Sequence, residues 1–272
     1  MKEIKKYRVK PGHKVNLSEF DPNERGHFES EADVIAETTD SIQKLDLLQQ
    51  RLYAEGKRGL LIVLQAVDTG GKDGTIRHVM KGINPQGCRV TSFKVPTPEE
   101  RAHDFLWRVH QHVPAKGFIG IFNRSYYEDV LVTRVHRLIS DQEEERRFEE
   151  INAFERILVE NGTTILKFYL GITRDEQRRR LQERIDDLDK RWKFSSNDLI
   201  ERRSWNRYPK IYAETISATS TKHAPWFLIP ANHKWYRNYL VAKILVATLE
   251  KMNPQFPDNP EGIDFSKVKI PA

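Results

Sequence analysis

The hydrophobic positions of the chain gather in five short stretches, which predict the strands of a sheet. The first, Gly59–Val67, carries almost no polar residue, which is typical of a parallel strand buried on both faces. The other predicted strands are Arg89–Val95, Phe118–Phe122, Thr164–Leu170 and Trp226–Ile229.

Between these stretches, apolar residues recur at spacings of three and four, which predicts amphipathic helices. Residues 30–56 contain Ile35, Leu45 and Leu52 in such a pattern, and this helix is expected to end at Gly56. Further helices are expected at about 73–84, 97–112, 126–160 in two pieces, 174–187 and 233–252. Alternating strands and helices predict an α/β fold, here a three-layer α/β/α sandwich with a five-stranded parallel sheet.

We interpret residues 1–272 as a single domain. Residues 1–28 lack periodicity and are expected to form an extended arm over the body, followed by a leading helix at 29–56. Residues 173–212 hold twelve Lys or Arg and eight Asp or Glu, too many charges for core helices. We therefore expect this stretch, the lid segment, to be a mobile module above the sheet. An irregular tail is expected at 253–272.

Composition limits the compartment and the partners. The 272 residues include one cysteine, Cys88, so no intrachain disulfide can form and a reducing, cytoplasmic location is expected. The charged start of the chain lacks the apolar core of a secretory signal, and no apolar run approaches the ~20 residues that span a bilayer. The net charge of +6 favours anionic ligands, without choosing among nucleotides, nucleic acids and membrane surfaces.

A glycine-rich stretch after the first strand predicts a phosphate-binding loop. Gly70 and Gly71 allow backbone N–H groups to converge on phosphate oxygens, and the following helix offers its N-terminus to the anion. Lys72 adds a positive charge, and Asp73, Gly74 and Thr75 are expected to complete the phosphate site.

This loop departs from the usual G-x-x-x-x-G-K-[ST] pattern. Ala66 replaces the first glycine, and Asp73 stands where Ser or Thr should hold Mg²⁺, a role that Thr75 could fill instead. Asp68 inside the loop would repel phosphate unless a cation lies between them, which suggests that it holds Mg²⁺. The alternative is that Asp68 caps a turn and the glycines merely end a strand.

A second polar motif follows the third predicted strand. Asn123, Arg124 and Ser125 are expected to emerge beside the phosphate loop, because ligands of open parallel sheets bind at the carboxyl ends of the strands. Arg124 can offer a bidentate fork to a phosphate. Glu128 and Asp129 begin the next helix, where they could simply complement its dipole, and Asp129 is also a candidate metal ligand beside Asp68.

The lid segment carries a third set of cations. Arg174, Arg178, Arg180 and Arg184 are interpreted as lying along one predicted helix, presenting their guanidinium groups from one edge. In phosphoryl transfer, cations of a closing lid neutralise charge on the transferred group. The alternative is a solvated helix with Glu–Arg pairs that contribute little.

Together these motifs resemble the second family of polyphosphate kinases, the thymidylate-kinase-like polyphosphate:nucleotide phosphotransferases. The resemblance covers nearly the whole chain and rests on Tyr7–Gly12, Ala66–Gly74, Phe105–His110, Phe122–Ser125, Tyr127–Leu131, Arg191–Phe194 and Lys234–Arg237. Many relatives have Asp at the position of Asn123. In this respect the chain is most similar to the third subclass, whose members use both nucleoside mono- and diphosphates.

The resemblance implies a P-loop kinase fold with a helical lid, and it implies roles for particular residues. Asp68 and Lys72 would be a catalytic pair, with Asp68 acting through Mg²⁺, while Asn123 and Arg124 would face the transferred phosphoryl group. The lid residues Arg184, Arg191 and Lys193 would bind the phosphate chain. Family members are commonly homodimers or homotetramers.

We therefore expect an Mg²⁺-dependent transfer of the terminal phosphoryl group of inorganic polyphosphate to AMP and ADP, giving ADP and ATP; guanine nucleotides stay open as acceptors. One alternative is an ATP-dependent nucleoside or nucleotide kinase of the same fold. Another is a basic nucleic-acid-binding module, which is disfavoured because the basic residues flank the phosphate loop and no nucleic-acid motif is present. No nucleic-acid or membrane partner is expected.

Overall fold

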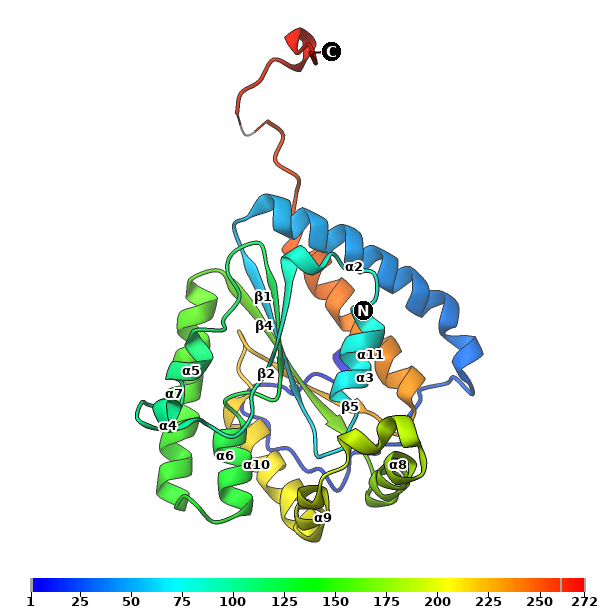
Figure 1. The fold of residues 1–272 in the computed structure, drawn as a ribbon, viewed down its shortest axis with the longest axis vertical. Coiled ribbons are helices and arrows are strands. Elements are labelled where there is room, and N and C mark those ends of the chain that lie inside the picture. Colours follow the sequence, from blue (N-terminus) through cyan, green and yellow to red (C-terminus); the bar gives the residue numbers. More distant parts are fainter. Residues whose placement is uncertain (1, 260, 272) are drawn as a thin grey trace.

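A five-stranded parallel sheet forms the middle layer of the computed structural model, which describes residues 2–259 and 261–271 (Figure 1). The strands are β1 (Gly59–Gln65), β2 (Cys88–Ser92), β3 (Ile119–Asn123), β4 (Thr163–Gly171) and β5 (Trp226–Pro230). Their order is β2-β3-β1-β4-β5, and every neighbouring pair is parallel. The predicted fold class and all five predicted strands are confirmed, with small differences in their ends.

Helices cover both faces of the sheet. One face is covered by α2 (Ile35–Glu55), α3 (Lys72–Val79) and α11 (Lys234–Met252), with α11 packed on the other two. The opposite face is covered by α6 (Glu128–Val135), α7 (Asp141–Glu160) and α10 (Tyr208–Thr219). Each layer has its own hydrophobic core, because parallel strands bury apolar side chains on both sides.

Two predicted helices were wrong in extent. Residues 97–112 form two short helices, α4 (Pro98–Arg101) and α5 (Trp107–His110), rather than one. The break falls at Asp104, whose carboxylate accepts a hydrogen bond from the Leu106 backbone N–H at 3.0 Å and so starts a new turn. The helix expected at 73–84 ends at Val79, before Gly82, whose φ of +93° cannot continue a helix.

The N-terminal arm lies along the β5 edge of the sheet. It starts with α1 (Lys2–Lys5) and then pairs with β5 through an isolated antiparallel bridge between Arg8 and Phe227. The hydroxyl groups of Tyr7 and Tyr236 are 2.7 Å apart, which ties the arm to α11. Residue 1 of the predicted arm, and residues 260 and 272 of the predicted tail, lie outside the described residues. The described part of the tail leaves the body at the edge opposite α8 and α9, and contains η5 (Phe265–Lys267) (Figure 1).

The lid segment lies at the carboxyl edge of the sheet (Figure 1). It consists of α8 (Arg174–Asp186), η3 (Leu188–Lys193), α9 (Ser196–Arg203) and η4 (Trp205–Arg207), followed by the start of α10. Tyr208 and Tyr212 are buried and pack in the hydrophobic core, so the last residues of the predicted segment belong to the body. No helix in the described ranges is long and apolar enough to cross a membrane. The short η1 (Glu31–Asp33) and η2 (Pro85–Gly87) complete the elements.

Candidate functional site

The phosphate loop, residues 66–72, turns sharply between β1 and α3. Gly71 has a φ of +102° and caps the N-terminus of α3, a conformation that favours glycine. Gly70 lies so close to the side chain of Ala66 that a Cβ at this position would overlap with it. Both glycines are therefore required by the path of the loop, and this path brings the N-terminus of α3 to the carboxyl edge of the sheet.

Lys72 is a buried cation at the base of this loop. Its Nζ donates to the carbonyl oxygen of Ala66 at 2.8 Å and has no carboxylate partner among the described residues. Burial, and then the charge of Arg124, lower the pKa of Lys72. An anion in the loop would relieve this electrostatic cost, as expected for a phosphate-binding lysine.

The predicted second motif meets the phosphate loop where β3 ends. Arg124 has a φ of +64°, and its Nη2 donates to Asp68 Oδ1 at 2.8 Å. Asn123 Nδ2 donates to Asp73 Oδ1 at 2.5 Å. The strand register explains the meeting, since Leu64 of β1 is the partner of Asn123 in β3. The structure thus brings the four predicted residues Asp68, Asp73, Asn123 and Arg124 together.

The site contains an acid whose role the sequence left open. Glu128 interacts electrostatically with Arg124, Lys72 and Asp68, and burial raises its pKa, while Arg124 opposes that rise. The side-chain amide of Gln65 donates to Glu128 Oε1 at 2.8 Å when its oxygen is oriented to accept from Ser125. Glu128 is therefore an acidic neighbour of Arg124 and Lys72, and burial favours the protonated form of its carboxyl by raising its pKa.

Asp129 does not join the predicted site. It accepts from Arg108 Nη2 at 3.2 Å and lines a separate cavity of about 360 Å³. Neighbouring helical positions are 100° apart, so Glu128 and Asp129 point to different sides of α6. The predicted pairing of Asp129 with Asp68 as metal ligands is therefore corrected.

Thr75 does not face the cavity either. It is buried, and its hydroxyl donates to the carbonyl oxygen of Gly71 at 3.0 Å. The hydroxyl is thus used within the first turn of α3, and Thr75 does not line the cavity where the phosphate is expected. Gly74 and Asp73, by contrast, line the cavity described below.

The lid arginines divide between two faces of α8. Arg180 and Arg184 line the cavity, whereas Arg174 and Arg178 are exposed and do not line it. The expectation that all four share one edge was wrong. Residues four positions apart are rotated by only 40° around a helix, but residues six positions apart, such as Arg174 and Arg180, are rotated by 240°. Arg184 Nη1 donates to the carbonyl oxygen of Lys193 at 3.1 Å and lies 3.3 Å from Asp198 Oδ2.

The other two predicted lid residues behave differently. Lys193 lines the cavity, and its Nζ lies 5.0 Å from the centre of the Trp192 ring. Arg191 is exposed outside the cavity lining, and its Nε donates to the carbonyl oxygen of Ile185 at 2.7 Å. The structure therefore groups Lys193 with Arg184 and leaves Arg191 apart.

Two arginines of the cavity, Arg180 and Arg237, were not among the individually predicted site residues. Arg180 was named only as part of the helical row, and Arg237 only within a motif of the resemblance. Both are buried beside the phosphate loop, at 6% and 3% exposed. A sequence signal existed for Arg237: it is one of only two charged residues in the mostly apolar stretch 236–246 of α11, the other being Lys243.

The side chains that the structure does bring together, Asp68, Lys72, Asp73, Asn123, Arg124, Arg180, Arg184, Lys193 and Arg237, line one open cavity of about 1410 Å³, the central cavity. Its lining contains eleven Lys and Arg but only five Asp and Glu, so it favours a polyanion. The basic residues are Lys72, Arg77, Lys94, Arg124, Arg179, Arg180, Arg184, Lys190, Lys193, Lys234 and Arg237. They come from the phosphate loop, the edge of the sheet, the lid segment and α11.

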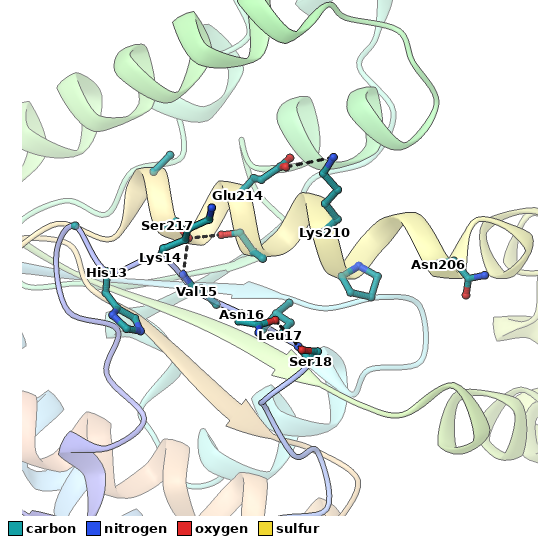
Figure 2. Close-up of a pocket in the computed structure, with 14 residues that line it drawn as sticks. His13, Lys14, Val15, Asn16, Leu17, Ser18, Asn206, Lys210, Glu214 and Ser217 are labelled. Atoms are coloured by element: carbon teal, nitrogen blue, oxygen red, sulfur yellow. Dashed lines mark hydrogen bonds and ion pairs between the residues drawn. The ribbon is translucent and has the colours of Figure 1, made fainter.

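A second cavity, of about 830 Å³, lies between the arm and α10 (Figure 2). Lys210 and Glu214 of α10 form an ion pair on one side, and Val15 N donates to Ser217 Oγ at 2.8 Å where the arm meets the helix. None of the predicted site residues lines this cavity. It plays no part in the site described above.

The fold and the central cavity place the chain in the P-loop kinase class of phosphotransferases. A family model described as "Polyphosphate kinase 2 (PPK2)" matches residues 29–257. The chain therefore belongs to the polyphosphate kinase 2 family, as the sequence motifs predicted, and it is an enzyme of the phosphotransferase type.

Similar proteins match over nearly their whole length. An "AMP/ADP-polyphosphate phosphotransferase" of Meiothermus ruber is 54% identical over 255 residues, covering 93% of this chain and 96% of that protein. An "ADP-polyphosphate phosphotransferase" of Rhodopseudomonas palustris is 41% identical, covering 94% and 93%. The crystal structure of polyphosphate kinase 2 from Arthrobacter aurescens TC1 has a TM-score of 0.91 and 43% identity, covering 96% of this chain and 93% of that one.

Proposed function

We propose that the protein transfers the terminal phosphoryl group of inorganic polyphosphate to AMP and to ADP, giving ADP and ATP. The observation that carries this proposal is the central cavity, where eleven basic side chains surround a phosphate loop. A single nucleotide would not require so many cations, whereas a chain of phosphates would. The acceptors are inferred from the Meiothermus ruber relative, whose name includes both AMP and ADP.

In this proposal the chain acts mainly by positioning and by neutralising charge. Lys72 and the backbone N–H groups at the start of α3 bind oxygens of the phosphate at the loop. Arg124, released from Asp68, forms a bidentate contact with the transferred group. Arg184 and Lys193 of the lid segment then approach from above and exclude water.

The residues present fit an Mg²⁺ ion. Mg²⁺ binds through one or two carboxylates, several waters and substrate phosphates. Asp68 is about one-fifth exposed, and both Asp68 and Asp73 line the cavity. No group of three or more His, Cys, Asp or Glu within the described part of the chain could hold a metal alone, so substrate phosphates would complete the ligand set. When bound, Mg²⁺ would neutralise the charge of the phosphate chain.

A direct assay tests this function. Purified protein is mixed with Mg²⁺, long-chain polyphosphate and either AMP or ADP, and the nucleotides are separated by chromatography. We expect ATP from ADP, and ADP followed by ATP from AMP, only when polyphosphate is present and Lys72 is intact. Product from one acceptor alone would contradict the dual acceptor range.

The remaining alternatives are tested in the same series. Consumption of ATP with added nucleosides, but no product from polyphosphate, would instead identify an ordinary nucleoside kinase. Binding to DNA or RNA with a steep salt dependence and no turnover would identify a nucleic-acid-binding protein. The expected cytoplasmic location and the homodimer or homotetramer stay predictions.

A further inference from the structure

Arg237 is a buried cation without a carboxylate partner among the described residues. Its side chain is 3% exposed, and its Nε and Nη2 donate to Oδ1 of the neighbouring Asn238 at 3.1 and 2.8 Å. Buried charges are usually paired, because removing an isolated ion from water is costly. The bonds to a neutral amide oxygen leave the charge of this guanidinium uncompensated.

The free part of this guanidinium lies against the phosphate loop. A Cβ at Gly71 would overlap with Arg237 Nη1, and a Cβ at Gly74 would lie 3.4 Å from its Nη2. Nη1 donates no hydrogen bond to any residue in the described ranges. The unused donors therefore adjoin the N-terminus of α3, which itself attracts anions.

Arg180, the neighbouring arginine, differs from Arg237 because a carboxylate compensates its charge. Arg180 Nε donates to Glu176 Oε1 at 2.6 Å, and its Nη1 donates to the Thr69 carbonyl oxygen at 3.0 Å. Burial, and then the charge of Arg180, lower the pKa of Arg237 to about 9. The fold thus holds two cations together at the loop while it provides an acid for only one of them.

The two sides of the loop also differ in charge. On the β3 side, Asp68 and Asp73 pair with Arg124 and Asn123. On the α11 side, Arg237 and Lys234 both line the central cavity. Lys234 lies about one turn before Arg237 in α11 and is more exposed. Glu183 also lines the cavity, and its Oε2 lies 3.7 Å from Lys234 Nζ.

We propose that Arg237 binds a phosphate group of the donor chain that is not itself transferred, and so holds the polyphosphate on the α11 side of the phosphate loop. This inference rests on the proposed function and deepens it, because it assigns the donor to one side of the loop and the acceptor to the other. The guanidinium fork of Arg237 and the adjoining N–H groups of α3 suit an internal phosphate of the chain, which is anionic and is linked to a phosphate on each side.

Binding measurements on the full chain test this assignment without turnover. Inorganic tripolyphosphate is titrated by calorimetry into the wild type, Arg237→Met and Arg237→Lys. We expect at least about tenfold weaker binding for Arg237→Met and an intermediate loss for Arg237→Lys, because a charged hydrogen bond is lost or weakened. Lys251→Gln, in the exposed last turn of α11, is the control for net charge and should bind as the wild type does.

Steady-state kinetics then separate binding of the donor from a structural role. Arg237→Met should raise KM for polyphosphate about tenfold and leave KM for ADP within about twofold. Its melting temperature without ligand should equal or exceed that of the wild type, because an uncompensated buried charge is removed. Equal KM changes for both substrates with a lowered melting temperature would show that Arg237 only supports the loop, and would overturn the inference.

The two proposals fail in different ways. If Arg237→Met binds tripolyphosphate as tightly as the wild type and keeps its KM for polyphosphate, the role of Arg237 is wrong and the proposed function stands. If the wild type transfers no phosphoryl group from polyphosphate, the proposed function is wrong. Should Arg237→Met fail to fold, Arg237→Lys decides, and unchanged tripolyphosphate affinity in that variant overturns the inference.

Discussion

Arg124 Nη2 and Asp68 Oδ1, from the ends of two neighbouring strands, are 2.8 Å apart and form an ion pair inside the central cavity. Arg124 remains more than two-fifths exposed and Asp68 about one-fifth exposed, so both side chains are accessible to a ligand. A phosphate could exchange for the carboxylate, since both are anions that suit the same guanidinium fork. The pair is therefore the point where substrate binding should first change the site.

Removing either charge of the phosphate loop should reduce turnover. We expect Lys72→Ala and Asp68→Ala each to lower kcat by about 100-fold or more, the scale of losing one preorganised electrostatic group. The measurement is the initial rate of ATP formation from ADP and polyphosphate. Lys251→Gln should keep the wild-type rate, and circular dichroism should show that all variants are folded. Near-normal turnover in Lys72→Ala would contradict the proposed site.

A methyl group at Gly71 should destabilise the loop more than the same change at a comparable glycine. Gly71 and Gly82 have φ angles of +102° and +93°, but a Cβ at Gly82 has open space, whereas one at Gly71 would overlap with Arg237. We expect Gly82→Ala to lower the free energy of unfolding by about 1 kcal/mol and Gly71→Ala by roughly 2–3 kcal/mol. Urea unfolding measures both, and equal losses would show that Arg237 does not restrict Gly71.

The buried ion pair between Lys167 and Glu155 should be important for stability. Both side chains are fully buried, their Nζ and Oε2 are 2.6 Å apart, and Tyr126 and Tyr127 each donate to the other carboxylate oxygen at 2.8 Å. We expect Lys167→Met alone to cost about 3–5 kcal/mol, because Glu155 would remain as an unpaired buried charge.

The double variant Lys167→Met with Glu155→Gln provides the matched test of this pair. It removes both charges and should recover part of the lost stability, because no uncompensated ion remains. Urea unfolding of the wild type, the single variant and the double variant gives the comparison. A double variant less stable than Lys167→Met would show that the charge itself is not the cause.

Cys88 should react slowly with alkylating reagents. Burial raises the pKa of its thiol to about 11, so the thiolate is scarce near neutral pH. At pH 8 we expect alkylation by iodoacetamide to be about 100-fold slower in the native protein than in denaturant, where the pKa returns to its ordinary value. Mass spectrometry over time gives both rates, and comparable rates would contradict the assigned burial.

Patterns within short segments correctly predicted the sheet and the phosphate loop. The five apolar stretches became five parallel strands, because side chains buried on both faces leave a signal in consecutive residues. Gly70 and Gly71 were recognisable because a turn that requires glycine is set by consecutive residues. The break in the helix predicted at 97–112 was missed, because it depends on one hydrogen bond that the Asp104 carboxylate accepts from the Leu106 N–H, and periodicity does not detect such a bond.

The sequence by itself determined the fold class, the family and the residues at the ends of β1 and β3, since these depend on contiguous motifs and on the rule that parallel strands end at one edge. Only the tertiary structure decided which way individual side chains face. It left Asp129, Thr75 and Arg191 outside the cavity lining, added Arg237 to that lining, and placed Glu128 in electrostatic contact with Arg124 and Lys72. These directions depend on which face of each helix packs against the body, as α11 packs beside α3, and such packing brings together residues far apart in the sequence.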